Sequence, residues 1–162
     1  FSNDATGSLV TNLTIDTTGA VLNPVQPAFL ATPASSQDDI ALDTTTAIVF
    51  GTEVFDQGSD FASNTFTAPV TGKYQLNALI LMGNVDSASE NYRFAIYTHN
   101  RIYYSTLDPD FGQDALRYTM TPISVLADMD AGDTAYCTIY QKDGTQQTDL
   151  YPESYFSGFL AC

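Results

Sequence analysis

The chain is organised around the stretch Asn64-Thr65-Phe66-Thr67-Ala68-Pro69-Val70-Thr71-Gly72-Lys73-Tyr74-Gln75-Leu76. Phe66 lies between two threonines, and this alternation of apolar and polar residues is typical of a half-buried strand. Pro69 has no N–H group to donate to a sheet, so it should end that strand. Gly72 supplies a turn position, and from Tyr74 to Met82 the alternation resumes. The stretch therefore predicts a short strand, a turn and a long central strand against which the rest of the chain packs.

The remaining sequence also favours strands. Of the 162 residues, 44% are hydrophobic and 12% are aromatic, and no window carries an apolar stripe at helical spacing. Pro122 lies inside one predicted strand, which must then be an edge strand or contain a bulge. We expect an N-terminal arm over residues 1–25 and a sandwich or jelly-roll head over residues 26–162. Besides the two strands above, the patterns predict strands at 29–31, 47–50, 53–55, 92–97, 102–104, 116–126, 135–140 and 155–161.

The Phe, Ala-Pro, Gly and Tyr of the central stretch resemble the signature of the C1q-domain family, which reads roughly F-x-A-P-x-x-G-x-Y-x-F. Leu76 stands where that family usually has Phe. The resemblance implies an all-β, ten-stranded C1q/TNF-like jelly roll that assembles as a tight homotrimer and works as a binding head. Three further segments agree with family motifs in order and spacing: Pro27-Ala28-Phe29, Ala131-Gly132-Asp133 followed by Ala135, and Ser157-Gly158-Phe159-Leu160.

The acidic loop 108–114 and the Thr/Asn-rich lead-in are similar to those of heads at the C-termini of phage tail-fibre proteins. The chain starts at Phe1 and not at Met, which we interpret as part of a longer fibre or virion protein. We expect a virion or extracellular location and recognition of a cell-surface glycan or protein. Two alternatives stay open: a structural trimerisation cap or capsid or tail decoration without a receptor, and an enzyme that hydrolyses surface glycans.

The charge narrows the choice of partners. Five Lys and Arg face 19 Asp and Glu, which gives a formal net charge of −14. Such a surface repels phosphate backbones, so we expect no nucleic acid as partner. No apolar run reaches the roughly 20 residues of a membrane span, so we expect no membrane insertion. A trimer would carry −42 (3 × −14), and packing that charge together requires salt or bound cations.

The sequence offers little support for an active site. His99 is the only histidine and falls in a predicted hairpin turn, and no Gly-x-Ser-x-Gly elbow occurs. Paired carboxylates of the kind that glycosidases use lie in loops, with no aromatic platform beside them. We therefore expect no enzyme.

The acidic turn with Asp128, Asp130 and Asp133 has the oxygen ligands that calcium prefers, although a tight turn between strands explains the same residues. The loop with Asp108, Asp110 and Asp114 leaves the same two interpretations open. We expect no required cofactor, with calcium as the ion that these loops would take.

Cys137 falls in a strand pattern and is expected to be a small buried residue. Its pairing with the terminal Cys162 is left open, because the sequence does not give the Cα separation that decides a disulfide.

Nine of the ten tyrosines follow the central strand. Most are expected to pack on the sheets, whereas a few suit a binding surface because Tyr combines a flat apolar face with a hydrogen-bonding tip. The candidates for a receptor or subunit interface are Tyr103, Tyr104, Tyr118, Tyr151, Asp108 and Asp110. The residues expected in the core are Phe66, Tyr74, Leu76, Ile80, Phe94, Ile139 and Phe159, and Gly158 is expected where a side chain would clash.

Overall fold

The computed structural model describes the whole chain except residues 1, 4–8, 11–12 and 111–118. Every regular element in the described part is a strand, as the composition predicts. The arm holds β1 (Ser2–Asn3), β2 (Leu9–Val10), β3 (Thr14–Ile15) and β4 (Val21–Leu22). The head holds β5 (Ala28–Thr32), β6 (Thr46–Ala47), β7 (Thr52–Gln57), β8 (Phe61–Ala62), β9 (Thr65–Thr67), β10 (Gly72–Gly83), β11 (Asn91–Thr98), β12 (Ile102–Leu107), β13 (Thr119–Met129), β14 (Thr134–Lys142), β15 (Asp149–Leu150) and β16 (Tyr155–Leu160).

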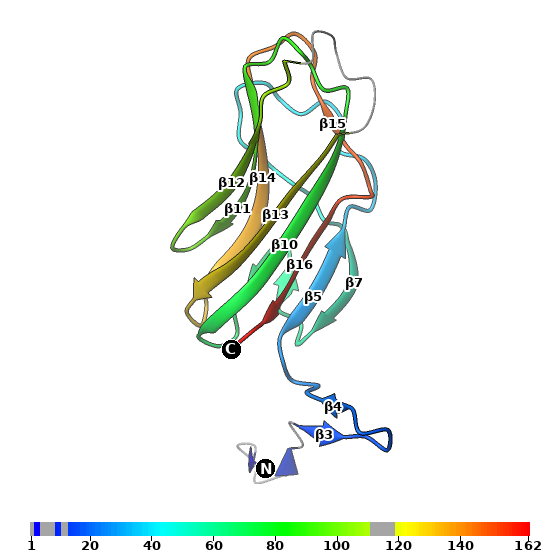
Figure 1. Cartoon of the computed structure of the whole chain (residues 1–162), viewed down its shortest axis with the longest axis vertical. Coiled ribbons are helices and arrows are strands. Elements are labelled where there is room, and N and C mark those ends of the chain that lie inside the picture. Colours follow the sequence, from blue (N-terminus) through cyan, green and yellow to red (C-terminus); the bar gives the residue numbers. More distant parts are fainter. Residues whose placement is uncertain (1, 4–8, 11–12, 111–118) are drawn as a thin grey trace.

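The head is a sandwich of two six-stranded antiparallel sheets (Figure 1). The first sheet has the order β13-β10-β16-β5-β7, with β15 also paired to β10. The second has the order β12-β11-β14-β9-β8, with β6 also paired to β14. The central strand predicted from the sequence is β10, which pairs with β13 along one side and with β16 and β15 along the other. Consecutive strands often lie in different sheets, which is the connectivity of a jelly roll.

The core lies between the sheets and is centred on stacked aromatic rings. The ring of Phe29 on β5 stacks on Phe66 at 4.7 Å and on Phe61 at 5.0 Å between centroids. Phe156 on β16 meets Phe29 edge-on at 5.0 Å. Phe29 and Phe156 belong to the first sheet and Phe61 and Phe66 to the second, so both sheets contribute to one aromatic cluster. Aromatic pairs in this geometry add about 0.5–1.5 kcal/mol beyond the burial of their area. Six of the seven predicted core residues are buried here: Phe66, Tyr74, Leu76, Ile80, Phe94 and Ile139.

The seventh, Phe159, was predicted wrongly: its side chain is 45% exposed on the outer face of the first sheet. Gly158 is buried as predicted, because a Cβ there would lie 2.7 Å from Leu76 Cδ2 and 2.8 Å from Phe29 Cε1. Successive residues of a strand point to opposite faces, so an inward Gly158 forces Phe159 outward. The inward aromatic residue of β16 is Phe156.

Two further details of the strands bear on the predictions. Pro122 lies in β13, which is an edge strand of the first sheet, as predicted. The predicted strand 47–50 is shorter than expected, since only Thr46–Ala47 pair as β6. Ile48 still donates to the Cys137 carbonyl at 3.0 Å. From Val49 on, side chains replace the sheet partner: Gln37 Oε1 accepts from the N–H of Val49 at 3.1 Å, and Asn64 Oδ1 accepts from that of Phe50 at 2.8 Å.

The arm extends below the sandwich from the end where the C-terminus also lies (Figure 1). Asp16 shapes the β3–β4 turn by accepting from the backbone N–H groups of Thr18 at 2.8 Å and Ala20 at 2.9 Å. Gln57 of the head donates to the carbonyls of Asn23 and Gln26 and so fixes the base of the arm. The apolar side chains of the hairpin, including Leu13, Ile15, Val21 and Leu22, are exposed.

Both cysteines are free thiols. Cys137 on β14 is buried in the core, as expected, and burial raises the pKa of its thiol well above the ordinary value. Cys162 is exposed at the C-terminus, so the structure decides against the Cys137–Cys162 bridge that the sequence left open. In the described part of the chain, no helix is long and apolar enough to cross a membrane.

Candidate binding groove

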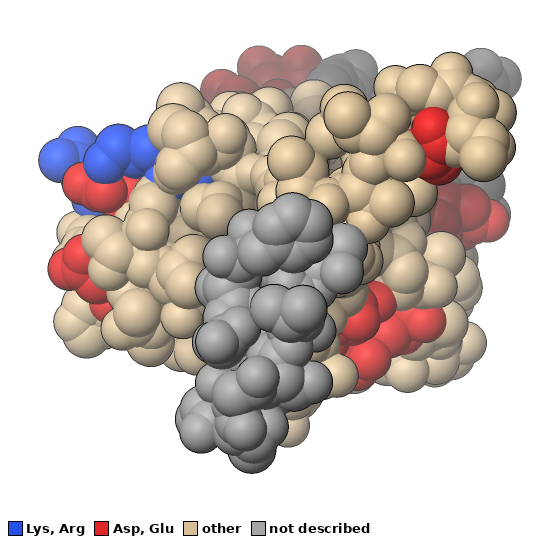
Figure 2. Space-filling model, turned by 90° about the horizontal axis from the view of Figure 1, so that it is seen from below, with Lys and Arg blue, Asp and Glu red and all other residues tan. Residues whose placement is uncertain are grey.

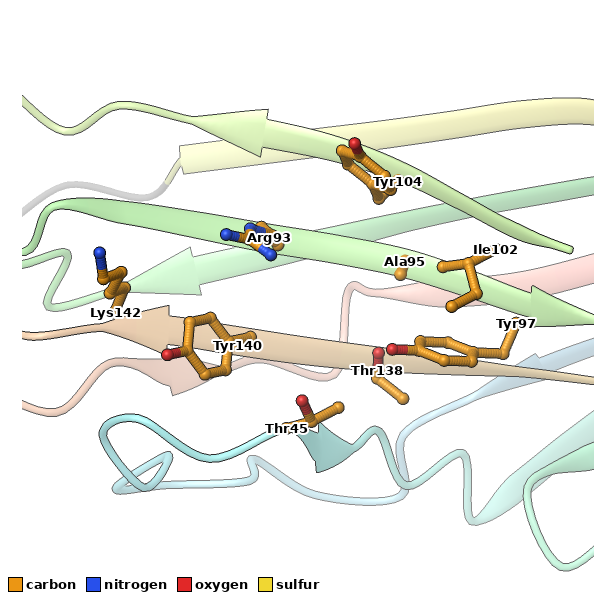
Figure 3. Close-up of a pocket in the computed structure, with 9 residues that line it drawn as sticks. All are labelled: Thr45, Arg93, Ala95, Tyr97, Ile102, Tyr104, Thr138, Tyr140 and Lys142. Carbon is orange, nitrogen blue, oxygen red and sulfur yellow. The ribbon is translucent and has the colours of Figure 1, made fainter.

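The outer face of the second sheet is hollowed along β11 and β14. Arg93, Ala95 and Tyr97 alternate with inward residues on β11, and Ala95 stands opposite Thr138 of β14. Two small side chains side by side leave a hollow, while the larger residues around them form its walls. The hollow has a volume of 330 Å³, near the lower end of the range for small-ligand sites. We call it the groove; its lining is Thr45, Arg93, Ala95, Tyr97, Ile102, Tyr104, Thr138, Tyr140 and Lys142 (Figure 3).

Aromatic side chains hold the shape of the groove. Tyr97 stacks on Tyr136, its partner across β11 and β14, with 5.3 Å between ring centroids. Tyr140 stands opposite Arg93, and its hydroxyl lies 3.4 Å from Asp43 Oδ1. These contacts order two of the three groove tyrosines before any ligand arrives, which lowers the entropic cost of binding.

The electrostatics of the groove differ from those of the chain as a whole. The Arg93 guanidinium lies over the Tyr140 ring, with Cζ 5.7 Å from its centroid, close enough for a cation–π contact. Lys142 Nζ forms an ion pair with Glu90, which raises the pKa of the Lys142 amine. Arg93 forms no ion pair with any carboxylate in the described part of the chain. Among the described residues, the groove therefore presents one cation without an ion-pair partner, beside flat aromatic surfaces and hydroxyl groups.

The structure separates the candidate residues that the sequence proposed. Tyr104, 66% exposed on β12, lines the groove, whereas its neighbour Tyr103 packs against the core. Tyr151 lies against Gly83 at the end of β10, where a Cβ on that glycine would be 2.4 Å from the tyrosine ring. Tyr118 lies outside the described residues.

The described start of the loop after β12 contributes no residue to the lining of the groove. Asp108 and Asp110 lie in this loop, and Asp108 Oδ1 accepts from the N–H of Asp110 at 3.2 Å. Asp114 is outside the described residues.

Sequence reasoning missed Arg93, Tyr97 and Tyr140 as functional candidates. The alternation that places them on one face was visible, since it predicted both strands. What the sequence does not give is the register that sets Ala95 opposite Thr138 and so opens the hollow. A cation and two tyrosines at outward positions of neighbouring strands would have been the usable signal.

The carboxylates of Asp128 and Asp133 in the acidic turn already bind groups of the chain itself. Asp128 Oδ1 pairs with Lys73 Nζ at 2.5 Å, and Asp133 Oδ2 accepts from Asn100 Nδ2 and from the N–H of Asp130, both at 3.0 Å. Across residues 2–3, 9–10, 13–110 and 119–162, no group of three or more His, Cys, Asp or Glu side chains is placed to hold a metal ion. A calcium site at this turn stays a prediction.

The outer face of the first sheet carries none of the groove residues and holds several exposed large apolar side chains among polar ones. Phe159 of β16 and Leu126 of β13 both lie on this face, on either side of Gln75 of β10. Gln75 donates to Ser124 Oγ at 3.0 Å, so the polar groups of this face already have partners. We call this surface the apolar face; its exposed large side chains are Phe55, Met120, Leu126 and Phe159, and Leu30 lies half-buried opposite Phe55.

Comparisons with solved structures place this sandwich among known jelly rolls. The globular domain of zebrafish complement 1qA protein superposes with a TM-score of 0.60 at 14% identity, covering 85% of this chain and 98% of that one. Murine APRIL superposes with a TM-score of 0.59 at 12% identity, covering 83% and 98%. Among curated proteins, none matched the chain. At such identities the likeness shows the fold alone: a C1q/TNF-like jelly roll.

The family follows from the sequence. The family model described as "C1q domain" matches residues 28–161, which is most of the chain. The chain belongs to the C1q domain family.

Proposed function

We propose that this chain is the trimeric binding head of a virion fibre or other surface fibre, and that it recognises a cell-surface glycan through the groove. The observation that carries the proposal is the division of labour between the two outer faces. One face is apolar and suited to burial, whereas the other holds a groove of aromatic, hydroxyl and cationic side chains. Such a head would lie outside the cell, on a virion or another extracellular fibre.

The apolar face supports assembly. Phe159, Leu126 and Phe55 are each about half exposed or more, although each has the size of a core residue. Several large apolar side chains exposed on one sheet face suit a protein–protein contact. We propose that this face packs against a second copy of the chain, because family membership accords with a closed homotrimer. The apolar side chains of the arm hairpin are also exposed and would be buried by the same assembly.

The groove supports recognition. Tyr faces and tips suit the alternating apolar and hydroxylated surfaces of a sugar ring, and Thr45 and Thr138 add further hydroxyl groups. A shallow site of this size binds weakly by itself. Three grooves on one rigid head raise the overall affinity by avidity, without any new contact.

The first test is to screen the purified chain for binding to a glycan array and to whole cells. The second is to measure its mass by sedimentation. We expect a particle of three times 17.5 kDa whose glycan binding falls at least tenfold in Tyr104→Ala. Thr52→Ala, an exposed change on β7 of the other sheet, is the control. A trimer that binds neither glycans nor cells would favour the structural cap. Release of reducing ends from a polysaccharide would favour the enzyme.

A further inference from the structure

The charge of the groove is opposite to that of the molecule around it. The chain has 19 acidic and five basic residues, yet two of those five, Arg93 and Lys142, line the groove. Figure 2, which views the molecule from the end of the arm, shows Asp and Glu at several separate places and Lys and Arg at one edge. Cations that face a hollow in so acidic a surface point to an anionic ligand group.

Arg93 is the cation available for that group. Lys142 is paired with Glu90, whereas Arg93 contacts the Tyr140 ring and forms no ion pair with any described residue. A ring contact leaves the guanidinium N–H groups free to donate. The planar fork of arginine matches a carboxylate in two parallel hydrogen bonds, which a lysine does not reproduce.

The surrounding charge limits how anionic the ligand is. A polymer with many charges, such as nucleic acid or a heavily sulfated glycan, would meet the acidic surface as well as the groove and be repelled by it. One carboxylate carried by an otherwise neutral saccharide reaches Arg93 and brings little further charge. The groove has room for one or two sugar rings, with Tyr104 and Tyr97 as flat walls and Ala95 and Thr138 as floor.

We infer that the groove takes a glycan bearing a single carboxylated sugar, with Arg93 as the carboxylate ligand and Tyr104 as the surface on which the ring lies. This inference rests on the proposed function and specifies its ligand class. An acidic peptide shares the carboxylate but lacks the hydroxylated ring that the tyrosine and threonine side chains suit.

The experiment titrates the intact chain with matched probes: a sialylated trisaccharide and its neutral parent disaccharide, a glucuronic-acid disaccharide and its neutral glucose analogue, and a Glu-rich peptide. The wild type should bind each carboxylated sugar at least tenfold more tightly than its neutral analogue. Arg93→Gln should abolish that preference, and Arg93→Lys should restore only part of it because the fork is lost. Ala95→Phe should fill the groove and remove binding of both sugar classes.

The matched control is Arg101→Gln, which removes an exposed cation outside the groove and should leave the preference intact. Melting temperature and sedimentation of every variant should equal those of the wild type, so a loss of binding is not a loss of fold. Equal binding of acidic and neutral sugars, still abolished by Ala95→Phe, would overturn this inference and leave the proposed function standing. Tighter binding of the peptide than of either sugar would overturn it also. No binding of any glycan by a folded trimer would overturn both.

Discussion

The two outer faces of the sandwich obey the same strand geometry and carry opposite chemistry. On the first sheet, the outward positions hold large apolar residues such as Phe159 and Leu126, and no groove residue lies there. On the second sheet, the outward positions of β11 and β14 hold small residues flanked by tyrosines and cations, which opens a groove. The inner faces must both be apolar for the sandwich to fold, so only the outer faces are free to differ. This difference is what supports the proposed division into a surface for assembly and a surface for recognition.

The largest expected effect compares two phenylalanines of the same strand. Phe156→Ala removes an inward ring that contacts Phe29 and Phe61, and should lower the free energy of unfolding by about 3–5 kcal/mol. Phe159→Ala removes an outward ring and should leave the folding of an isolated head nearly unchanged. Denaturant unfolding at low protein concentration measures both. Equal losses would mean that the assignment of faces on β16 is wrong.

The second prediction tests whether the apolar face is the subunit contact. Phe159→Glu would place a charge in a buried contact and should weaken assembly by about 2 kcal/mol or more per protomer, the scale of an interface hot spot. Sedimentation across a concentration series should show the mass falling toward 17.5 kDa. Arg93→Gln, a change on the opposite face, is the control and should leave the mass unchanged. If Phe159→Glu sediments like the wild type, assembly uses another surface.

Much of the fold followed from the sequence because β-strand signals are local. The alternation about Phe66 and Tyr74, the break at Pro69 and the edge position of Pro122 each depend on neighbours a few residues away. The error at Phe159 arose where two local signals competed, since a conspicuous aromatic next to a buried glycine was assigned to the same face. Gly158 determines which residues of β16 point inward, because the core has no room for a side chain at its position.

The candidate site followed far less well. The groove depends on which residues stand opposite one another across β11 and β14, and the sequence does not state that register. Tyr104 was proposed for its residue type alone, and Tyr103 was proposed with equal reason although it points toward the core. Ala95 and Thr138 carry no chemical signal, yet their small size creates the hollow.

The third prediction concerns the pH dependence of stability on the groove side of the molecule. Asp86 is 1% exposed and accepts from the N–H groups of Ala88 at 2.8 Å, Gln146 at 2.7 Å and Thr145. Burial alone raises the pKa of Asp86, but these hydrogen bonds outweigh it and hold the pKa below the ordinary value. The loop they hold follows β14, the strand that carries Thr138, Tyr140 and Lys142.

The sign of the pH effect follows from that lowered pKa. The stabilisation by Asp86 is complete above the unfolded value of about 4 and is lost as pH falls through the lower folded value. Asp86→Asn should cost about 1.5 kcal/mol at pH 7, because hydrogen bonds to a charged acceptor are replaced by weaker ones. It should also flatten the acid limb of a plot of unfolding free energy against pH. An acid limb as steep as that of the wild type would mean that other carboxylates govern acid unfolding.

The smallest effect is that of salt, and it should have opposite signs at the two faces. Three chains of charge −14 repel one another on assembly, and at physiological salt screening acts within about 8 Å, so sodium chloride should raise the melting temperature of the trimer modestly. The same screening should weaken the contact of Arg93 with a carboxylated sugar. Calcium at matched ionic strength adds stability only if the turn with Asp128, Asp130 and Asp133 binds it, and Asp130→Asn would then remove the addition. Each effect should stay below about 1 kcal/mol, the scale of exposed ion pairs. If salt leaves both assembly and sugar binding unchanged, the acidic surface is already dispersed, and electrostatics does not distinguish the two faces.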